Sequence, residues 1–141
     1  MKIITGSSDE TESQGEKFAK DLHPGDVVFL IGELGSGKTT FTKGIAKGLG
    51  ITTRITSPTF VLVREHHANN ESIKTLYHLD LYRLGSKNDV LGVDLTDYLN
   101  DSKGVVVIEW PELSQSIIKG SVWRVIFDYM GDKRSIEVIK E

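Results

Sequence analysis

The chain contains no cysteine. This absence excludes disulfides, thiol catalysis and cysteine-based zinc sites, and it fits a reducing compartment. The sequence also has no apolar run that approaches the length of a membrane span, and residues 1–5 do not resemble the start of a signal peptide. We therefore expect a cytoplasmic protein that has no membrane partner.

The sequence also lacks an excess of positively charged residues. The formal net charge is −3, whereas proteins that grip RNA or DNA by themselves are usually basic. Any role with nucleic acid is therefore expected to be indirect, or confined to a local basic patch.

The composition that is present suits one folded domain over residues 1–141, with 38% hydrophobic and 26% charged residues. Solid apolar runs at 27–31 and 105–108 predict strands that are covered on both faces. Alternation over 73–82 predicts a further strand, and 121–129 with 135–139 reads as a closing hairpin. Together these patterns predict an α/β fold with a mixed parallel and antiparallel sheet.

Weaker signals complete the expected order of elements. Residues 1–5 suggest an edge strand, and Ser7 to Asp9 offer caps for a helix whose buried face carries Thr11, Gly15, Phe18 and Leu22. The polar residues 66–72 suggest a hairpin loop in which His66 and His67 are solvated. Short helices are expected within 85–100 and around Ile117 and Ile118.

The most informative segment, Gly32–Thr39, fits the pattern G-x-x-x-x-G-K-[ST] without a mismatch. It follows an apolar strand and precedes a helix whose apolar residues recur at 41, 45 and 49, which is the context that a phosphate-binding loop requires. Lys38 is placed to reach the β and γ phosphates of a nucleotide, and Thr39 to bind Mg²⁺. The expected nucleotide contacts are Glu33, Leu34, Gly35, Ser36, Gly37, Lys38, Thr39 and Thr40. The alternative, a glycine-rich turn with a surface lysine, does not need this context.

Two carboxylates are candidates for the chemistry of such a site. Glu109 follows the apolar strand 105–108, and the carboxyl ends of strands are where ligands bind in open α/β folds. It could hold Mg²⁺ directly or through water, or polarise the attacking water. Asp80 lies on the strand face opposite an apolar stripe, where a carboxylate is costly unless it is paired or binds a metal. A pair with Arg83 or a solvated edge position remains an equal alternative for Asp80.

Other residues suggest less. Thr59, in Ser-Pro-Thr-Phe, could sense the γ-phosphate, but an ordinary loop is the simpler interpretation. The four histidines show no metal-binding spacing. Trp110 is expected to be a core aromatic, or a partner contact if it is exposed. Arg124 and Arg134, on the last hairpin, could approach the phosphates, but most such arginines are solvated.

Four blocks in this order closely resemble the TsaE (YjeE) family: Gly-Glu-Leu-Gly-Ser-Gly-Lys-Thr-Thr-Phe, Ser-Pro-Thr-Phe, His-Leu-Asp-Leu-Tyr-Arg and Ile-Glu-Trp-Pro-Glu. The resemblance covers nearly the whole chain and implies a compact P-loop nucleotide-hydrolase domain. It further implies an ATPase that is needed for threonylcarbamoyladenosine in tRNA. Such an ATPase acts with the TsaB–TsaD pair and resets it by hydrolysing ATP, so it meets tRNA indirectly through that complex.

The resemblance also implies site residues and cofactors. Lys38 and the loop amides would bind the phosphates of ATP, and Thr39 and Glu109 would hold Mg²⁺. Asp80 would be a second functional acid, and Thr11 would contact the nucleotide. Thr59 matches the family's switch-like segment, and Trp110 matches the tryptophan that follows the acid.

Three other functions compete with this one. A small-molecule or nucleoside kinase would need a lid that bears an arginine, and residues 85–100 carry none. A GTP-dependent switch would need an Asn-Lys-x-Asp guanine reader, which Ser86-Lys87-Asn88-Asp89 does not match. A structural partner with a relic loop would neither bind nor hydrolyse ATP.

Overall fold

The computed structural model of the chain describes residues 1–33, 35–55, 63–81, 95–110, 118 and 122–141. Within these ranges, seven strands form one sheet and three helices accompany it. In chain order the elements are β1 (Lys2–Thr5), α1 (Ser8–Ala19), β2 (Val27–Ile31), α2 (Lys38–Gly48), β3 (Val63–His67), β4 (Thr75–Asp80), α4 (Thr96–Leu99), β5 (Gly104–Glu109), β6 (Val122–Met130) and β7 (Lys133–Lys140).

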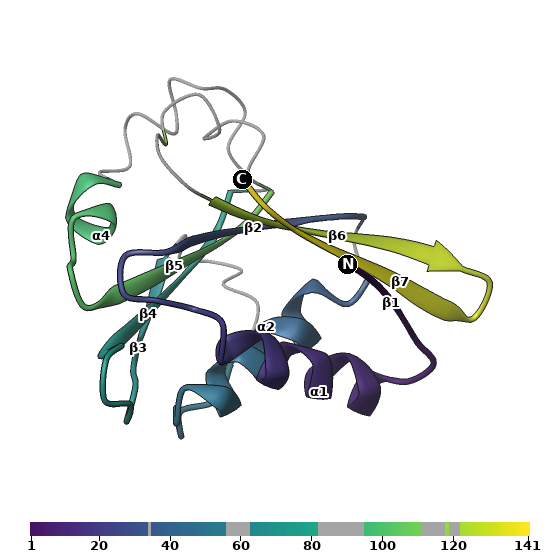
Figure 1. The fold of residues 1–141 in the computed structure, drawn as a ribbon, viewed down its shortest axis with the longest axis horizontal. Helices are drawn as coiled ribbons and strands as arrows, with labels where there is room; N and C mark the ends of the chain where they lie inside the picture. Colours follow the sequence, from purple (N-terminus) through teal and green to yellow (C-terminus); the bar gives the residue numbers. More distant parts are fainter. Residues whose placement is uncertain (34, 56–62, 82–94, 111–117, 119–121) are drawn as a thin grey trace.

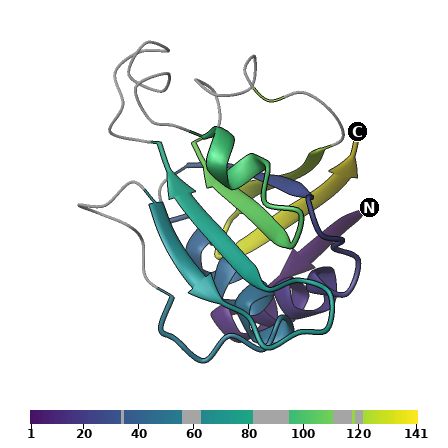
Figure 2. The same cartoon turned by 90° about the vertical axis from the view of Figure 1, so that its left-hand side faces the viewer.

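The sheet has the strand order β1-β7-β6-β2-β5-β4-β3. Its four central strands, β6, β2, β5 and β4, are parallel to their neighbours among themselves. β3 joins antiparallel at one edge, while β7 and then β1 join antiparallel at the other. Figure 1 shows the whole sheet, and Figure 2 shows the teal strands β3 and β4 beside the green β5. The predicted α/β fold with a mixed sheet is confirmed, as are the edge strand β1 and the closing hairpin of β6 and β7.

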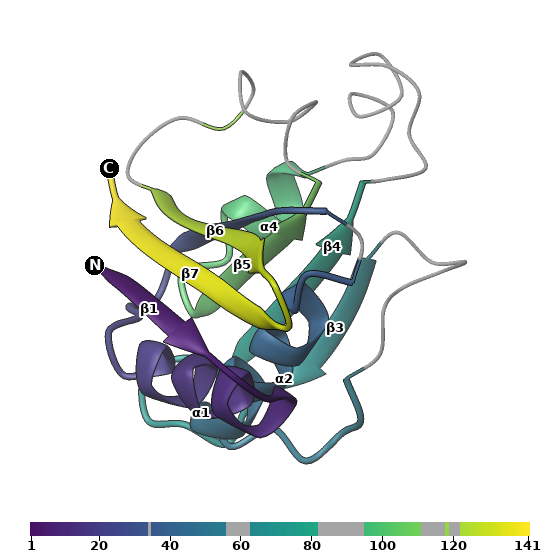
Figure 3. The same cartoon turned by 90° about the vertical axis from the view of Figure 1, so that its right-hand side faces the viewer.

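One face of the sheet is covered by α1 and α2, which lie side by side (Figures 1 and 3). Phe18 of α1 and Phe41 and Ile45 of α2 pack there against apolar residues of β2, β5, β6 and β7. The two helices approach so closely that a Cβ at Gly44 would overlap the carbonyl oxygen of Glu12. The first helix begins at the predicted cap, because the Ser7 hydroxyl accepts a hydrogen bond from the amide of Glu10 at 3.2 Å.

The other face carries a second apolar cluster around α4. Leu95 and the half-buried Tyr98 and Leu99 pack there with Phe29, Ile108 and other strand residues. Because β2 and β5 bury side chains on both faces, they read in sequence as continuous apolar runs. No helix in the described part of the chain is long and apolar enough to cross a membrane.

The prediction of a polar, solvated loop over 66–72 was wrong at its start. β3 extends through His67, and the side chain of His66 is buried with only 5% exposed. Its Nδ1 lies 2.8 Å from the hydroxyl of Thr53, a residue distant in sequence that no local pattern could reveal. Burial lowers the pKa of His66, with smaller contributions from nearby His78 and Arg64. His66 is therefore a neutral core residue near neutral pH.

Part of the expected helical region, α4, is confirmed at Thr96–Leu99. Residues 85–94 and the helix expected around Ile117 lie outside the described residues, as does the Ser-Pro-Thr-Phe segment that contains Thr59.

Candidate functional site

The glycine-rich segment joins β2 to α2 at the carboxyl end of the parallel strands. Gly35 and Gly37 have φ angles of 78° and 110°, a left-handed conformation that side chains with a Cβ rarely adopt. Gly37 is the N-cap of α2, and no side chain caps this helix end. The first amides of α2 therefore point at the loop without a side-chain partner, which suits an anion held there.

Ser36 supports the same interpretation. Its side chain is 1% exposed, and its hydroxyl finds no hydrogen-bond partner among the residues that the structure describes. A buried hydroxyl without a partner is costly, and an acceptor such as a phosphate oxygen would satisfy it. Both the backbone of the loop and the buried hydroxyl of Ser36 are therefore suited to a bound phosphate group.

Lys38 lies inside the loop and is only 4% exposed. Its ammonium donates a hydrogen bond to the carbonyl oxygen of Gly32 at 2.7 Å. It also lies 3.6 Å from the ring centroid of Trp110, which is a cation–π distance. The lysine is thus a buried cation at the loop and not the surface lysine of a simple turn.

Asp80 and Glu109 come together at the ends of two neighbouring strands. They are register partners of the parallel pair β4 and β5, so their side chains leave the same face of the sheet. Both line a cavity of about 230 Å³, together with Lys38, Thr39 and Trp110. The structure therefore places two carboxylates opposite the lysine and the threonine of the glycine loop.

Glu109 is almost completely enclosed, with 3% of its surface exposed. One of its oxygens, Oε2, lies 2.5 Å from Nε2 of His78, a histidine of β4 with no exposed surface. An ionised carboxylate can only accept, so with Glu109 in that form the ring donates from Nε2. The acid is thereby anchored from the interior of the sheet while it lines the cavity.

Trp110 follows Glu109 directly and takes an unusual backbone conformation. Its φ is 59°, the one positive value found for a non-glycine residue among those described. This turn carries the half-buried indole over Lys38. The expectation of a core aromatic is thus met in part: Trp110 packs against the apolar cluster around α4, and it also forms part of the cavity wall.

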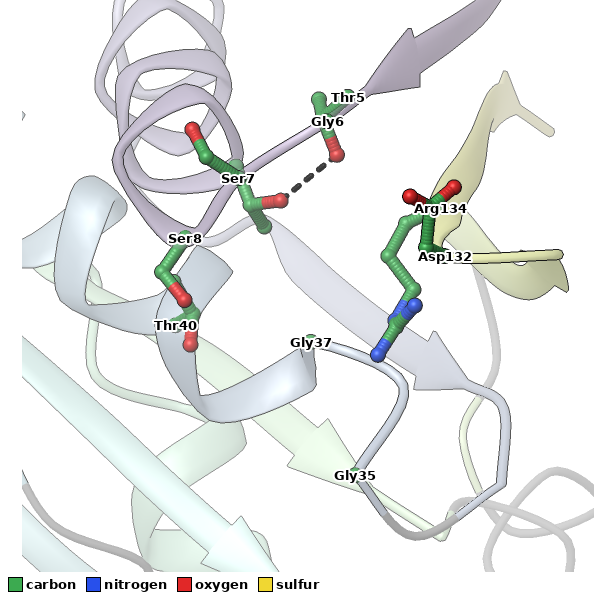
Figure 4. A pocket seen from close by; sticks show the side chains of 10 residues that line it. Thr5, Gly6, Ser7, Ser8, Gly35, Gly37, Thr40, Asp132 and Arg134 are labelled. Carbon is green, nitrogen blue, oxygen red and sulfur yellow. Dashed lines mark hydrogen bonds between the residues drawn. The ribbon is translucent and has the colours of Figure 1, made fainter.

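A second cavity, also of about 230 Å³, lies on the other side of the glycine loop (Figure 4). Figure 4 shows the side chain of Arg134 extending from the start of β7 toward Gly37 and Gly35. The buried hydroxyl of Thr11 also lines this cavity and is 2.7 Å from that of Thr5. The complete lining is Thr5, Gly6, Ser7, Ser8, Thr11, Gly35, Gly37, Thr40, Asp132 and Arg134.

Most of the predicted site residues lie around these two cavities. Gly35, Gly37 and Thr40 line both of them. Glu33 is exposed and lines neither; its carbonyl oxygen accepts a hydrogen bond from the Ser36 amide at 3.1 Å. Leu34 and Thr59 lie outside the described residues.

Sequence reasoning undervalued two residues. Arg134 was expected to be solvated, yet it is half-buried and lines the second cavity. Arg124, the other arginine of the hairpin, forms an ion pair with Glu141 at 2.9 Å. A single histidine on a strand is no signal of a site, although the spacing of two between His78 and Asp80 does place both on one face.

The carboxylates and the threonine also fit a magnesium ion. Among the described residues, no three His, Asp or Glu side chains gather to hold a metal by themselves. Mg²⁺ is usually held by one or two protein oxygens together with the phosphates of a substrate, and the Thr39 hydroxyl and a carboxylate would supply those oxygens. The site therefore suits a metal that arrives with a nucleotide.

Comparison with known proteins agrees with this geometry. The family model described as "Threonylcarbamoyl adenosine biosynthesis protein TsaE" matches residues 5–136. The chain belongs to the TsaE family. The resemblance that the four sequence blocks indicated is thereby confirmed.

Individual TsaE proteins match over most of their length. The chain is 38% identical to the "tRNA threonylcarbamoyladenosine biosynthesis protein TsaE" of Bacillus subtilis, with 94% of this chain and 80% of the relative covered. It is also 38% identical to the protein of the same name from Haemophilus influenzae, with 90% and 81% covered. A crystal structure of Bacillus subtilis YdiB superposes with a TM-score of 0.81 at 33% identity, covering 99% of this chain and 84% of that one. The fold of YdiB is thus shared over nearly all of this chain.

Proposed function

We propose that this chain is a Mg²⁺-dependent ATPase that takes part in forming threonylcarbamoyladenosine in tRNA. The observation that carries the ATPase proposal is one cavity in which Lys38 and Thr39 of the glycine loop face Asp80 and Glu109. Membership of the TsaE family, whose relatives are named for threonylcarbamoyladenosine biosynthesis, supports the pathway.

In this proposal the nucleotide lies across the glycine loop. The amides of the loop and the ammonium of Lys38 bind the β and γ phosphates on the side of the acids. The nucleoside side extends toward the second cavity, where Thr11 and Thr40 are available to it. A phosphate would replace the Gly32 carbonyl as the partner of the Lys38 ammonium.

The acids have separate roles. Glu109 and the Thr39 hydroxyl hold Mg²⁺, and Asp80 is the second acid, which orients the attacking water. When bound, Mg²⁺ supplies neutralisation of the charge that develops on the phosphates. Glu109 could alternatively act on the water itself, and both roles need its carboxylate to face the cavity.

We further propose that the chain works in the cytoplasm with a TsaB–TsaD pair, which hydrolysis resets between turnovers. Contact with tRNA is then indirect, consistent with a net charge of −3. The described lining of the cavity with the acids contains no arginine, so this chain by itself offers little extra positive charge to a transition state.

Substitution at the loop and at the acid tests this assignment. Lys38→Ala should lose detectable ATP binding or hydrolysis, because Lys38 is the one cation among the described residues that line the cavity with the acids. Glu109→Ala should slow hydrolysis by about 100-fold or more, the scale of a lost catalytic group. ATP binding and phosphate release are measured, with Lys43→Ala, an exposed lysine of the same helix, as the control that keeps both.

The same assay separates the ATPase from its main rival, a small-molecule or nucleoside kinase. An ATPase releases inorganic phosphate, whereas a kinase transfers the γ-phosphate to an acceptor. Stoichiometric transfer to a nucleoside or metabolite would refute the proposal, as would wild-type turnover in both Lys38→Ala and Glu109→Ala.

A further inference from the structure

We propose that His78 is a positioning residue, which holds the carboxylate of Glu109 in its working orientation. The inference rests on the proposed function, since it gives His78 a role only through Glu109. His78 has no exposed surface, and its Nε2 lies 2.5 Å from Oε2 of the acid. It therefore reaches the cavity through Glu109 and not directly.

The sheet register builds this contact. In the parallel pair of β4 and β5, Asp80 is opposite Glu109 and His78 is opposite Val107. Alternate residues of a strand share a face, so His78, Asp80 and Glu109 all lie on the side that α1 and α2 cover. His78 is thus the diagonal neighbour that lies behind Glu109, one step deeper in the sheet than Asp80.

The hydrogen bond divides the work of the two carboxylate oxygens. Oε2 accepts from His78, so Oε1 is the oxygen left for a water or metal in the cavity that Glu109 lines. A glutamate side chain has three rotatable bonds. A second partner that fixes its rotamer in the free protein removes the entropic cost of ordering the side chain during turnover. Groups that orient a metal ligand or catalytic acid in this way typically change activity by about 10–100-fold when removed.

Packing alone gives no reason for a histidine here. The Nδ1 atom of His78 is buried and finds no partner among the described residues. The same face of β4 holds a fully buried leucine at Leu76, so an apolar residue is suited to this environment. Replacing a buried polar pair by apolar residues is often neutral or stabilising, so stability is a weak explanation for this pair.

The test compares His78→Leu, which cannot donate, with His78→Gln, whose amide can. ATP hydrolysis is measured at saturating ATP and Mg²⁺ with the TsaB–TsaD pair, and ATP affinity and thermal unfolding are measured separately. We expect His78→Leu to lower kcat by about 10–100-fold while ATP affinity stays within about threefold. His78→Gln should recover part of that loss.

His66 supplies the matched control. It is a buried histidine on the neighbouring strand, near His78, and its hydrogen bond goes to Thr53 and not to Glu109. His66→Leu should lower thermal stability as a core substitution does, but leave kcat of the folded protein near wild type. A loss of kcat in His66→Leu equal to that in His78→Leu would overturn the proposal, because removing a buried histidine that does not bond Glu109 would then have the same effect.

A double variant tests whether His78 acts through the acid. Once Glu109→Gln has removed the carboxylate, adding His78→Leu should cost little more, because residues that act as a unit are not additive. Fully additive losses would overturn the proposal. Wild-type turnover in Glu109→Gln would instead refute the proposed function of the acid itself, so the two failures are distinguishable.

A measurement without nucleotide covers the case in which His78→Leu does not fold. The Nε2 proton of His78 should give a downfield, slowly exchanging imidazole resonance in NMR spectra of the free protein. It should shift strongly in Glu109→Gln, and it should shift less and stay protected from exchange in His66→Leu, which changes a neighbour of His78 but not its partner. The proposal would be overturned if the Nε2 proton exchanged freely with water, or if its chemical shift did not change in Glu109→Gln.

Discussion

At the residue scale, Lys38 and Trp110 form a contact that a nucleotide bound as proposed would disturb. The ammonium of Lys38 lies between the Gly32 carbonyl and the face of the indole. Trp110 reaches this position through a left-handed backbone, a conformation that costs about 1–2 kcal/mol for a residue with a Cβ. Trp110 packs against the apolar cluster around α4, and its costly conformation also places the ring on the loop lysine, as is common at functional sites.

This contact makes Trp110 a reporter of phosphate binding. ATP should draw the ammonium of Lys38 away from the indole and so change the tryptophan emission. The chain has two tryptophans, and the other, Trp123, donates to Asp26 at 3.2 Å and lines neither cavity. Titration of ATP against emission should therefore show the change in Trp123→Phe and lose it in Trp110→Phe.

The comparison of these two variants is the control. Both remove one indole, so a general loss of signal cannot mimic the result. If Trp110→Phe kept the full change, the cation–π contact would not respond to nucleotide and our account of Lys38 would be wrong.

At the element scale, the sequence predicted what local patterns determine. The strands β2 and β5 are continuous apolar runs, and the glycine loop between β2 and α2 has its own motif. Lys38, Asp80 and Glu109 could therefore be named in advance as candidates. Their proximity follows from two further facts that alternation alone does not give: β4 pairs in parallel with β5, and β5 pairs in parallel with β2, which leads into the loop.

What escaped prediction depends on contacts between distant segments. His66 looked solvated because it lies among polar residues, and its burial comes from the long-range partner Thr53. Arg134 lines the second cavity because the β6–β7 turn returns beside the glycine loop. A hairpin can be predicted from its sequence, but the loop against which its turn lies cannot.

The packing of α1 on α2 gives a prediction at this scale. Gly44→Ala should destabilise the fold by about 1–3 kcal/mol, because the new methyl group would overlap the Glu12 carbonyl and push the helices apart. This cost outweighs the gain of about 1 kcal/mol that alanine brings to a helix interior. Thermal or denaturant unfolding measures the change. Lys43→Ala, at an exposed position one residue away, is the control, and its free energy of unfolding is expected to stay within about 0.5 kcal/mol of wild type. Equal stability of the two variants would contradict the close packing of the helices.

At the scale of the whole molecule, the described site offers more groups suited to holding a phosphate than groups suited to hydrolysing one. Every central strand ends toward the glycine loop, and the loop has a cavity on each side. The half-buried Arg134 lines the cavity away from the acids. The acids themselves face one buried lysine. A second protein that covers the cavity with the acids would exclude water and could add positive charge where it is needed.

We therefore expect hydrolysis by the purified chain to be slow and to rise strongly with the TsaB–TsaD pair. An arginine supplied by a partner is worth about 10³–10⁵ in rate in other P-loop proteins, so a rise of at least about 100-fold is expected if the pair completes the site. Phosphate release is measured with the pair absent, present, and present with Lys38→Ala in this chain, and tRNA modification is followed in the same mixtures. The Lys38→Ala mixture controls for ATP hydrolysis by the partners themselves. If the chain alone instead hydrolysed ATP at the full rate, with no change when the pair is added, the described cavity would already hold everything that hydrolysis requires. The proposal of a site completed by a partner would then be wrong.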